Sequence, residues 1–481
     1  MQVSTLSQSL ALRQSIGDMR ARFDDLQRQL STGLKNDTYA KLGTDRNQVL
    51  SLSNQLNRLS AYTNTISKTQ MRVEVMSDAL TRVNKIASDT RSTILTSGFE
   101  LVNGTQTSAQ ISANMNLDEL VNLMNLQVED RYLFGGRDTQ TRPVALPDKI
   151  LNGSGEKAGL KQFIDERAQA DLGADGRGRL TLGALGTTVT LAEDTAPGIF
   201  GFKLDGVTST LGNTNVTGPA GTPAGIDVEF TGVPNVGETI SFELALPDGT
   251  AATVTLKATA NNPPGVGEFT IGADAATTSV NFQAALDAAI QREAKVTLTA
   301  ASAVEASNNF FDYAAGGAPR RVDGPPFASA TGLKDASEAD TVFWYKGDLT
   351  GTPGKNMLAQ IDDGRQLAYG ARADQAAIRD TLKMSALLSA VTYTGQSGDT
   401  ETLSYNALTK RTGAVLNFKD TQSLEGHTDS MGTANANELL GDIENADAYE
   451  VGVKLTTLQT QLEASYRVTS MLAQMSLVNY L

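Results

Sequence analysis

The sequence predicts an α+β protein: a long antiparallel coiled-coil stem, paired from the N- and C-terminal helices, with an inserted β-rich outer domain. Near both ends of the chain, apolar residues recur in steps of three and four, the spacing of helices that pack along one another. Between about residues 145 and 330 this repeat gives way to alternating apolar and polar residues among many Gly, Thr and Asp. That pattern is typical of strands and turns.

The first predicted helix ends near residue 30, after a polar start at residues 1–10 that we expect to be disordered in an isolated subunit. Gly33 follows it and suits the left-handed residue that closes many helices. The apolar row of this helix keeps the four-three step without a gap, at Leu12, Ile16, Met19, Phe23, Leu26 and Leu30. Such a row requires a partner helix along its length.

A second helix is predicted from about residue 45 to residue 97, because the chain has no Gly or Pro from Thr44 to Ser97. Roughly fifty residues at about 1.5 Å each give a rod of roughly 75 Å. A helix of that length cannot bury its apolar face inside a compact domain, so it must lie along other helices. The apolar row includes Leu52, Leu56, Leu59, Ile66 and Val73.

The last predicted helix covers about residues 449–481, where no Gly follows Gly452 and no Pro occurs. Its heptad positions include Leu455, Leu458, Leu462, Met471 and Met475. We expect this row to pack against the row of the first helix, which makes the two ends of the chain one subunit-packing seam. The arrangement indicates assembly rather than catalysis.

Between these rods the sequence predicts smaller elements. A helix over about residues 108–130, with Val128 on its apolar side, leads into RYLFGGRDTQTRPV, where Gly135 and Gly136 form a tight turn. The insert is expected to hold hairpins at about 180–191 and 239–257, a strand at EFTIG, a helix near 280–292 and a strand at KVTLTAAS. After it we expect strands at 343–345 and 357–361 and a helix at 374–391, followed by a polar, Gly- and Thr-rich passage to about residue 432.

These elements define four predicted domains. Residues 1–145 form an N-terminal helical core, 146–335 an inserted β-rich surface domain, 336–430 a return segment, and 431–481 the C-terminal core helix. Trp344 is the single tryptophan, and we expect it to pack where the inserted domain meets the stem.

Composition excludes several classes of function. Lys and Arg number 40 against 54 Asp and Glu, and the formal net charge of −14 argues against binding nucleic acid or an anionic membrane surface. The absence of Cys excludes disulfides and thiolate metal sites. No stretch has the features of a cleaved signal peptide or a membrane-spanning helix, so these signals alone predict a soluble cytoplasmic protein.

Local motifs for catalysis, metals or cofactors are weak, and we predict no cofactor and no enzyme activity. Gly173, Gly176 and Gly178 have the spacing of neither a dinucleotide fingerprint nor a P-loop. His427, the single histidine, lies in a polar stretch and has no obvious orienting partner. The adjacent carboxylates at 24–25 and 129–130 point apart on a helix, and those at 442, 444 and 447 lack the Gly of a calcium loop.

The chain resembles the bacterial flagellin superfamily over about residues 1–145 and 430–481, with a looser likeness at 341–391. QLSTGLKND is similar to the turn between the first two helices of that family, and LQTQLEASYRVTSMLAQMSLVNYL to its C-terminal helix. RYLFGGRDTQTRP, DTVFWYKGD and YGARADQAAIRDTL resemble the hook-associated proteins that form the junction of hook and filament.

This resemblance implies a structural subunit of the bacterial flagellum that joins hook to filament by helical self-assembly. It also implies unfolded export by the flagellar type III apparatus without a cleaved signal, which replaces the cytoplasmic default, and an extracellular location. The expected partners are other copies of the chain, further axial proteins of the flagellum and an export chaperone. A filament flagellin is the alternative, a glycan-binding surface adhesin the second, and a glycosidase built from distant carboxylates the third.

Overall fold

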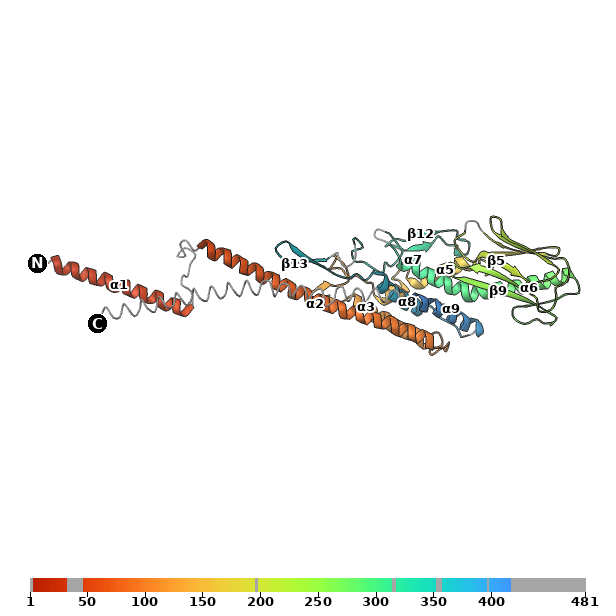
Figure 1. Ribbon diagram of the computed structural model, residues 1–481, viewed down its shortest axis with the longest axis horizontal. Helices are drawn as coiled ribbons and strands as arrows, with labels where there is room; N and C mark the ends of the chain where they lie inside the picture. Colours follow the sequence, from red (N-terminus) through yellow and green to blue (C-terminus); the bar gives the residue numbers. More distant parts are fainter. Residues whose placement is uncertain are drawn as a thin grey trace. The chain divides into compact units, whose positions relative to one another are not determined.

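The computed structural model describes residues 3–32, 46–194, 198–313, 317–351, 357–395 and 398–416. They fall into two compact units, which are described separately. The first contains Met1–Thr69 and Ala359–Leu367, and the second contains Gln70–Leu358 and Ala368–Leu481. Figure 1 shows the labelled elements coloured along the chain.

The first unit contains helical residues from α1 and α2, together with the facing ends of two strands within Ala359–Leu367. α1 runs over Val3–Thr32, and α2, over Arg46–Thr96, begins here and continues into the second unit. The predicted disordered start is wrong for residues 3–10, which are helical. No Gly or Pro precedes Gly17, and Leu6, Gln8 and Leu10 favour a helix there. The long second helix is confirmed within a few residues at each end.

A helical group forms one part of the second unit. It comprises the end of α2, α3 (Ser108–Met124), α4 (Pro147–Asn152), α5 (Leu160–Leu172), α7 (Thr299–Phe311), α8 (Ala376–Ala390) and α9 (Asp399–Val415). α3 packs on α8, α5 on α7, and α7 on both α8 and α9. Their shared core takes Ala87 and Ile94 from α2, Val304 from α7, Leu387 from α8 and Leu408 from α9. Thus helices from within the predicted insert pack against helices on either side of it.

α3 begins at a full capping box, in which Thr107 and Gln110 exchange side-chain and backbone hydrogen bonds. The predicted extension of this helix to residue 130 is wrong. The helix ends at Met124, and Val128 lies instead in β1 (Gln127–Val128), which pairs with β2 (Arg131–Tyr132). The reversal between them places Glu129 and Asp130 at positive φ, a conformation that no helix contains.

A β-sandwich forms the other part of the second unit. One sheet has the order β3 (Leu180–Leu185), β4 (Thr188–Glu193), β7 (Gly225–Phe230), β6 (Thr214–Ala220). The other has the order β10 (Glu268–Thr270), β9 (Ala251–Thr259), β8 (Thr239–Ala245), β5 (Lys203–Ser209). All neighbours are antiparallel except β9 and β10. Both predicted hairpins, β3–β4 and β8–β9, and the short strand β10 are confirmed.

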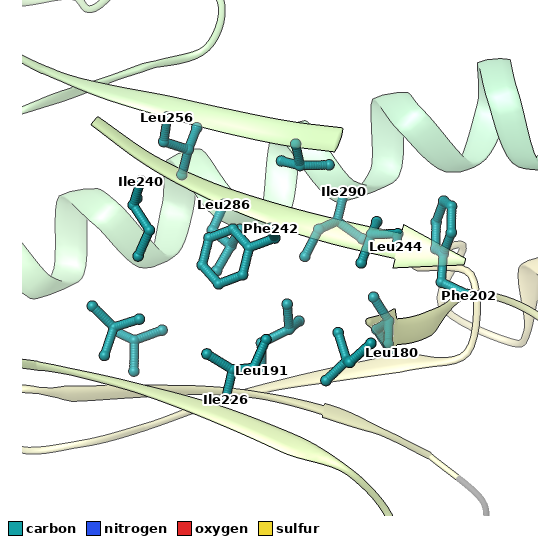
Figure 2. Packing of buried hydrophobic residues seen from close by; sticks show 14 of the residues in the cluster. Leu180, Leu191, Phe202, Ile226, Ile240, Phe242, Leu244, Leu256, Leu286 and Ile290 are labelled. Atoms are coloured by element: carbon teal, nitrogen blue, oxygen red, sulfur yellow. The ribbon is translucent and has the colours of Figure 1, made fainter. Parts of the chain in front are cut away.

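The sandwich core lies between the two sheets. Figure 2 shows Ile240, Phe242, Leu244 and Leu256 of one sheet facing Leu180, Leu191 and Ile226 of the other. α6 (Ala275–Glu293) adds Leu286 and Ile290 to the same cluster. All of these side chains are almost fully buried, so the alternating pattern of the sequence identified the inward faces of these strands.

The predicted strand at KVTLTAAS is wrong. α6 continues through a π-helical turn, η2 (Ala294–Leu298), directly into α7. Val296 and Leu298 are buried, whereas Lys295 is exposed and Thr297 partly so, as they would be in a strand, but no Gly or Pro interrupts the chain from Ala273 to Tyr313. A helix can therefore run through β-branched residues whose side chains are buried by tertiary packing.

The return segment is partly as expected. β11 (Arg320–Val322) and β12 (Leu333–Asp335) form a small pair with η3 (Phe327–Ser329) between them. The predicted strand at 343–345 is only an isolated bridge between Val144 and Tyr345. β13 (Met357–Asp362) is confirmed and pairs with β14 (Arg365–Tyr369), and α8 is confirmed. The polar passage after residue 391, in which the sequence predicted no element, contains α9.

Candidate assembly surface

α1 exposes its whole predicted apolar row. The exposed fractions are 66% for Leu12, 55% for Ile16, 56% for Met19, 66% for Phe23, 51% for Leu26 and 84% for Leu30. An isolated amphipathic helix is only marginally stable in water, and most helical stability comes from covering such a face. Fully burying one large apolar side chain contributes about 1.5–3 kcal/mol. Covering this row with a partner helix would therefore be strongly favourable.

The burial of the apolar row of α2 changes along the helix. In the first unit Leu52, Leu59 and Ile66 are partly buried, and Leu56 is 61% exposed. Within the second unit Val73 is partly buried, and the row that follows it is covered: Met76, Leu80, Val83 and Ile86 are each at most 2% exposed. A single continuous helix thus carries an apolar row that is covered at one end and accessible at the other.

Polar contacts fix the covered end of α2 in the second unit. Arg82 donates from Nη2 to Oε2 of Glu119 on α3 at 2.7 Å, with a second hydrogen bond from its Nε. This hydrogen bond to Arg82 outweighs the effect of burial and lowers the pKa of the Glu119 carboxyl. Asn116 of α3 donates to Thr90 Oγ1 at 3.0 Å, and Arg72 pairs with Glu129 at 2.8 Å.

Three sequence motifs that lie far apart in the chain meet at one place in the second unit. The amide of Asp348, in DTVFWYKGD, donates to the carbonyl of Gly135 at 2.9 Å. The amide of Ala373, in YGARAD, donates to the carbonyl of Phe134 at 3.1 Å. The amide of Lys346 donates to the carbonyl of Pro143 at 2.7 Å. The sequence singled out all three motifs, but it gave no sign that they form one structure.

The Gly135–Gly136 turn is required by close packing. Gly136 has φ +66°, and a Cβ on Gly135 would lie 2.4 Å from the carbonyl oxygen of Asp138. Beside the turn, Arg137 donates to Asp348 at 2.9 Å and Arg372 donates to Asp374 at 2.7 Å. Burial opposes ionisation of Asp348, but hydrogen bonds from Thr350 and Arg137 outweigh it and lower its pKa to about 2.

Trp344 packs within this region. Its indole N–H donates to the carbonyl of Phe311 at the end of α7, at 3.0 Å, and its ring lies 5.3 Å from the Phe311 ring. Tyr345, next in the chain, donates from Oη to the carbonyl of Phe134 at 3.4 Å. Burial raises the pKa of the Tyr345 hydroxyl well above its usual range.

Several predicted site residues lie outside the described residues. These are Gly33, Leu455, Leu458, Leu462, Met471 and Met475, together with His427 and the acidic group at 442–447. The structure therefore places the first-helix row, the second-helix row and the Gly135–Gly136 turn, and the pairing of the two terminal rows stays a prediction.

The glycine-rich loop with Gly173, Gly176 and Gly178 packs against the side chains of Arg179 and Phe202. A Cβ on Gly178 would lie 2.4 Å from Cδ2 of Phe202, so this glycine allows close packing onto the sandwich core. Across the described ranges no cluster of three His, Asp or Glu side chains could hold a metal ion. None of the described helices is long and apolar enough to cross a membrane.

An uncovered heptad row on α1, in a chain that also contains a well-packed helical group and β-sandwich, is typical of a class of protein: a subunit that completes its packing by assembling with other chains. The comparisons with known families agree with this class. Residues 3–139 match the bacterial flagellin N-terminal helical region, and residues 427–481 match the bacterial flagellin C-terminal helical region. No curated protein and no solved structure gave a match.

These two matches support the bacterial flagellin superfamily for this chain and, with it, a structural subunit of the flagellum. That family is structural rather than enzymatic, is extracellular, and self-assembles into flagellar filaments. The helices and sheets described above fit the α+β class that the sequence predicted.

Proposed function

We propose that the chain joins hook to filament, assembling helically through its two terminal helices. The observation that carries the proposal is the meeting of the three junction-type motifs around Gly135, Asp348 and Arg372. Because the motifs that resemble the junction proteins hydrogen-bond to one another, the resemblance covers segments that pack together rather than short scattered stretches.

In this proposal the packing surface is the exposed row of α1 from Leu12 to Leu30, continued by Leu52, Leu56, Leu59, Ile66 and Val73 of α2. Leu455, Leu458, Leu462, Met471 and Met475 supply the facing row. The chain leaves the cell unfolded through the flagellar export apparatus, escorted by a chaperone. Its terminal segments then gain their packing partners on assembly, so folding and assembly are coupled there.

Immunogold electron microscopy of sheared flagella tests the proposal, with antibody raised against residues 150–330. Gold confined to the boundary between hook and filament is the expected result. Gold along the entire filament would replace the proposal with a filament flagellin, which uses the same terminal helices. Gold on the cell body alone would contradict both and leave a surface adhesin.

A further inference from the structure

β9 has an open edge in the second sheet of the sandwich. β8 pairs with β9 along its whole length, but β10 faces only the last three residues, Lys257–Thr259. Within the described ranges, no strand pairs with the preceding stretch, Ala251–Leu256, on that side. The sequence of this stretch is AATVTL. Charged residues and Pro commonly protect the edges of sheets, and this stretch contains neither.

The hydrogen-bond phase of the strand shows which backbone groups face that edge. The amide of Ala258 donates to the carbonyl of Glu238, and the amide of Leu246 donates to that of Thr250. Bonded and non-bonded pairs alternate along an antiparallel ladder, so the even-numbered residues of β9 bond to β8. The N–H and C=O groups of Thr253 and Thr255 therefore point away from β8, in the same direction as the amide of Lys257, which donates to Gly267.

A groove of about 920 Å³ runs along this edge. Thr253 and Thr255 line one side and α6 another, and the segment from Asn262 to Glu268 and Leu403 and Ala407 of α9 also line it. The inner face of α6 is fixed in the sandwich core by Leu286 and Ile290 (Figure 2), so the helix is a rigid wall. Four of the α6 residues that line the groove are alanines, which leaves room beside the strand: Ala284, Ala285, Ala288 and Ala289.

The charges in the groove compensate one another. Glu268 accepts a hydrogen bond from Lys257 at 3.2 Å, and Arg292 and Glu293 carry opposite charges at one end. The groove is thus close to neutral on a chain whose formal net charge is −14. An unpaired strand edge offers donors and acceptors in the spacing of another polypeptide backbone, and a neutral wall of alanines favours uncharged side chains.

We propose that this groove binds an extended, uncharged peptide segment of a partner protein, which adds to β9 as a further strand. Main-chain hydrogen bonds to Thr253 and Thr255 hold the segment, and every second side chain lies against the alanine row of α6. The inference is independent of the junction function, because it concerns the outer sandwich and not the terminal helices.

Selection of displayed random heptapeptides on the full-length chain tests the proposal, followed by fluorescence anisotropy with the enriched peptides. We expect uncharged sequences rich in Thr, Val and Ala, and slowed hydrogen exchange at the Thr253 and Thr255 amides on binding. Thr253→Pro removes one outward N–H without touching the β8 ladder, and Ala288→Trp fills the groove. Each should weaken binding about tenfold or more, which corresponds to about 1.4 kcal/mol.

Ala276→Trp is the matched control, because it places the same bulk on an exposed turn of α6 outside the groove. It should bind the peptides like the unsubstituted chain. Ala288→Trp changes an exposed residue, so its folding is checked by an unchanged Tm. The proposal is overturned if no peptide is enriched, or if the enriched peptides bind Ala288→Trp and Thr253→Pro as tightly as they bind the control.

Discussion

Replacing Phe23 by Asp should separate assembly from folding of the subunit. Phe23 is 66% exposed in α1, so its substitution removes almost no contact within the chain. Exposed substitutions of this kind change the free energy of unfolding by about 0.5 kcal/mol or less. In an assembled seam the remaining two thirds of the side chain would be buried. That burial contributes about 1–2 kcal/mol, before the additional cost of desolvating the new carboxylate.

A loss of about 1.4 kcal/mol weakens an equilibrium tenfold, so incorporation of Phe23→Asp into flagella should fall by at least about tenfold. The assay compares the amount of chain in sheared flagella with the amount in the culture medium. Urea unfolding of the soluble chain measures its stability. Ala21→Asp adds the same charge two residues away, on the opposite face of α1, and should still be incorporated.

Normal incorporation of Phe23→Asp would refute the reasoning. So would a loss of more than about 1 kcal/mol in the stability of the soluble subunit, because that would mean Phe23 is already buried within the chain.

Three further predictions concern the second unit. Asp248→Asn breaks the ion pair with Arg411, in which the Asp248 side chain is 4% and the Arg411 side chain 9% exposed, and should lower the free energy of unfolding by about 3 kcal/mol. Urea titration checks this against Lys85→Gln, which breaks an exposed ion pair worth less than about 1 kcal/mol. Gly178→Ala should lower Tm clearly more than Gly176→Ala does, because both glycines have positive φ but only Gly178 packs against Phe202. Equal losses of Tm would exclude a clash with Phe202 as the cause. The pKa of Asp348 falls from 3.8 to about 2 on folding, so its ionised form stabilises the fold by on the order of 2 kcal/mol above pH 4. This stabilisation is lost as the pH falls from about 4 to about 2. The stability of Asp348→Asn should not show that loss over the same pH range.

Periodicity predicted the elements whose burial is regular. The heptad row of α2 and the alternation of Ile240, Phe242 and Leu244 each repeat over several turns or residues, so the element type and the buried face could be read directly. α9 was missed because two of its buried positions, Thr409 and Thr412, carry polar residues. With Tyr405 and Leu408 they do follow a helical spacing, and that was the signal available.

Packing between distant segments could not be predicted from one sequence. KVTLTAAS alternates like a strand, but the helices on both sides determine its conformation. The contacts among the segments that contain Gly135, Asp348 and Arg372 depend on where three loops end. The groove beside β9 exists because β10 pairs with only three residues of that strand. Neither leaves a local pattern in the chain, since both result from tertiary contacts between well-separated residues.

Thiol labelling of assembled flagella tests the central claim most directly, namely that the apolar row of α1 becomes a packing surface on assembly. The chain has no cysteine, so Phe23→Cys and Leu185→Cys each introduce a single thiol. Leu185 is 85% exposed in the outer sandwich and reports reagent access. Both thiols should react rapidly with a maleimide in the soluble subunit, and in intact flagella only the thiol at position 23 should be protected. Equal reaction at position 23 before and after assembly would contradict the account.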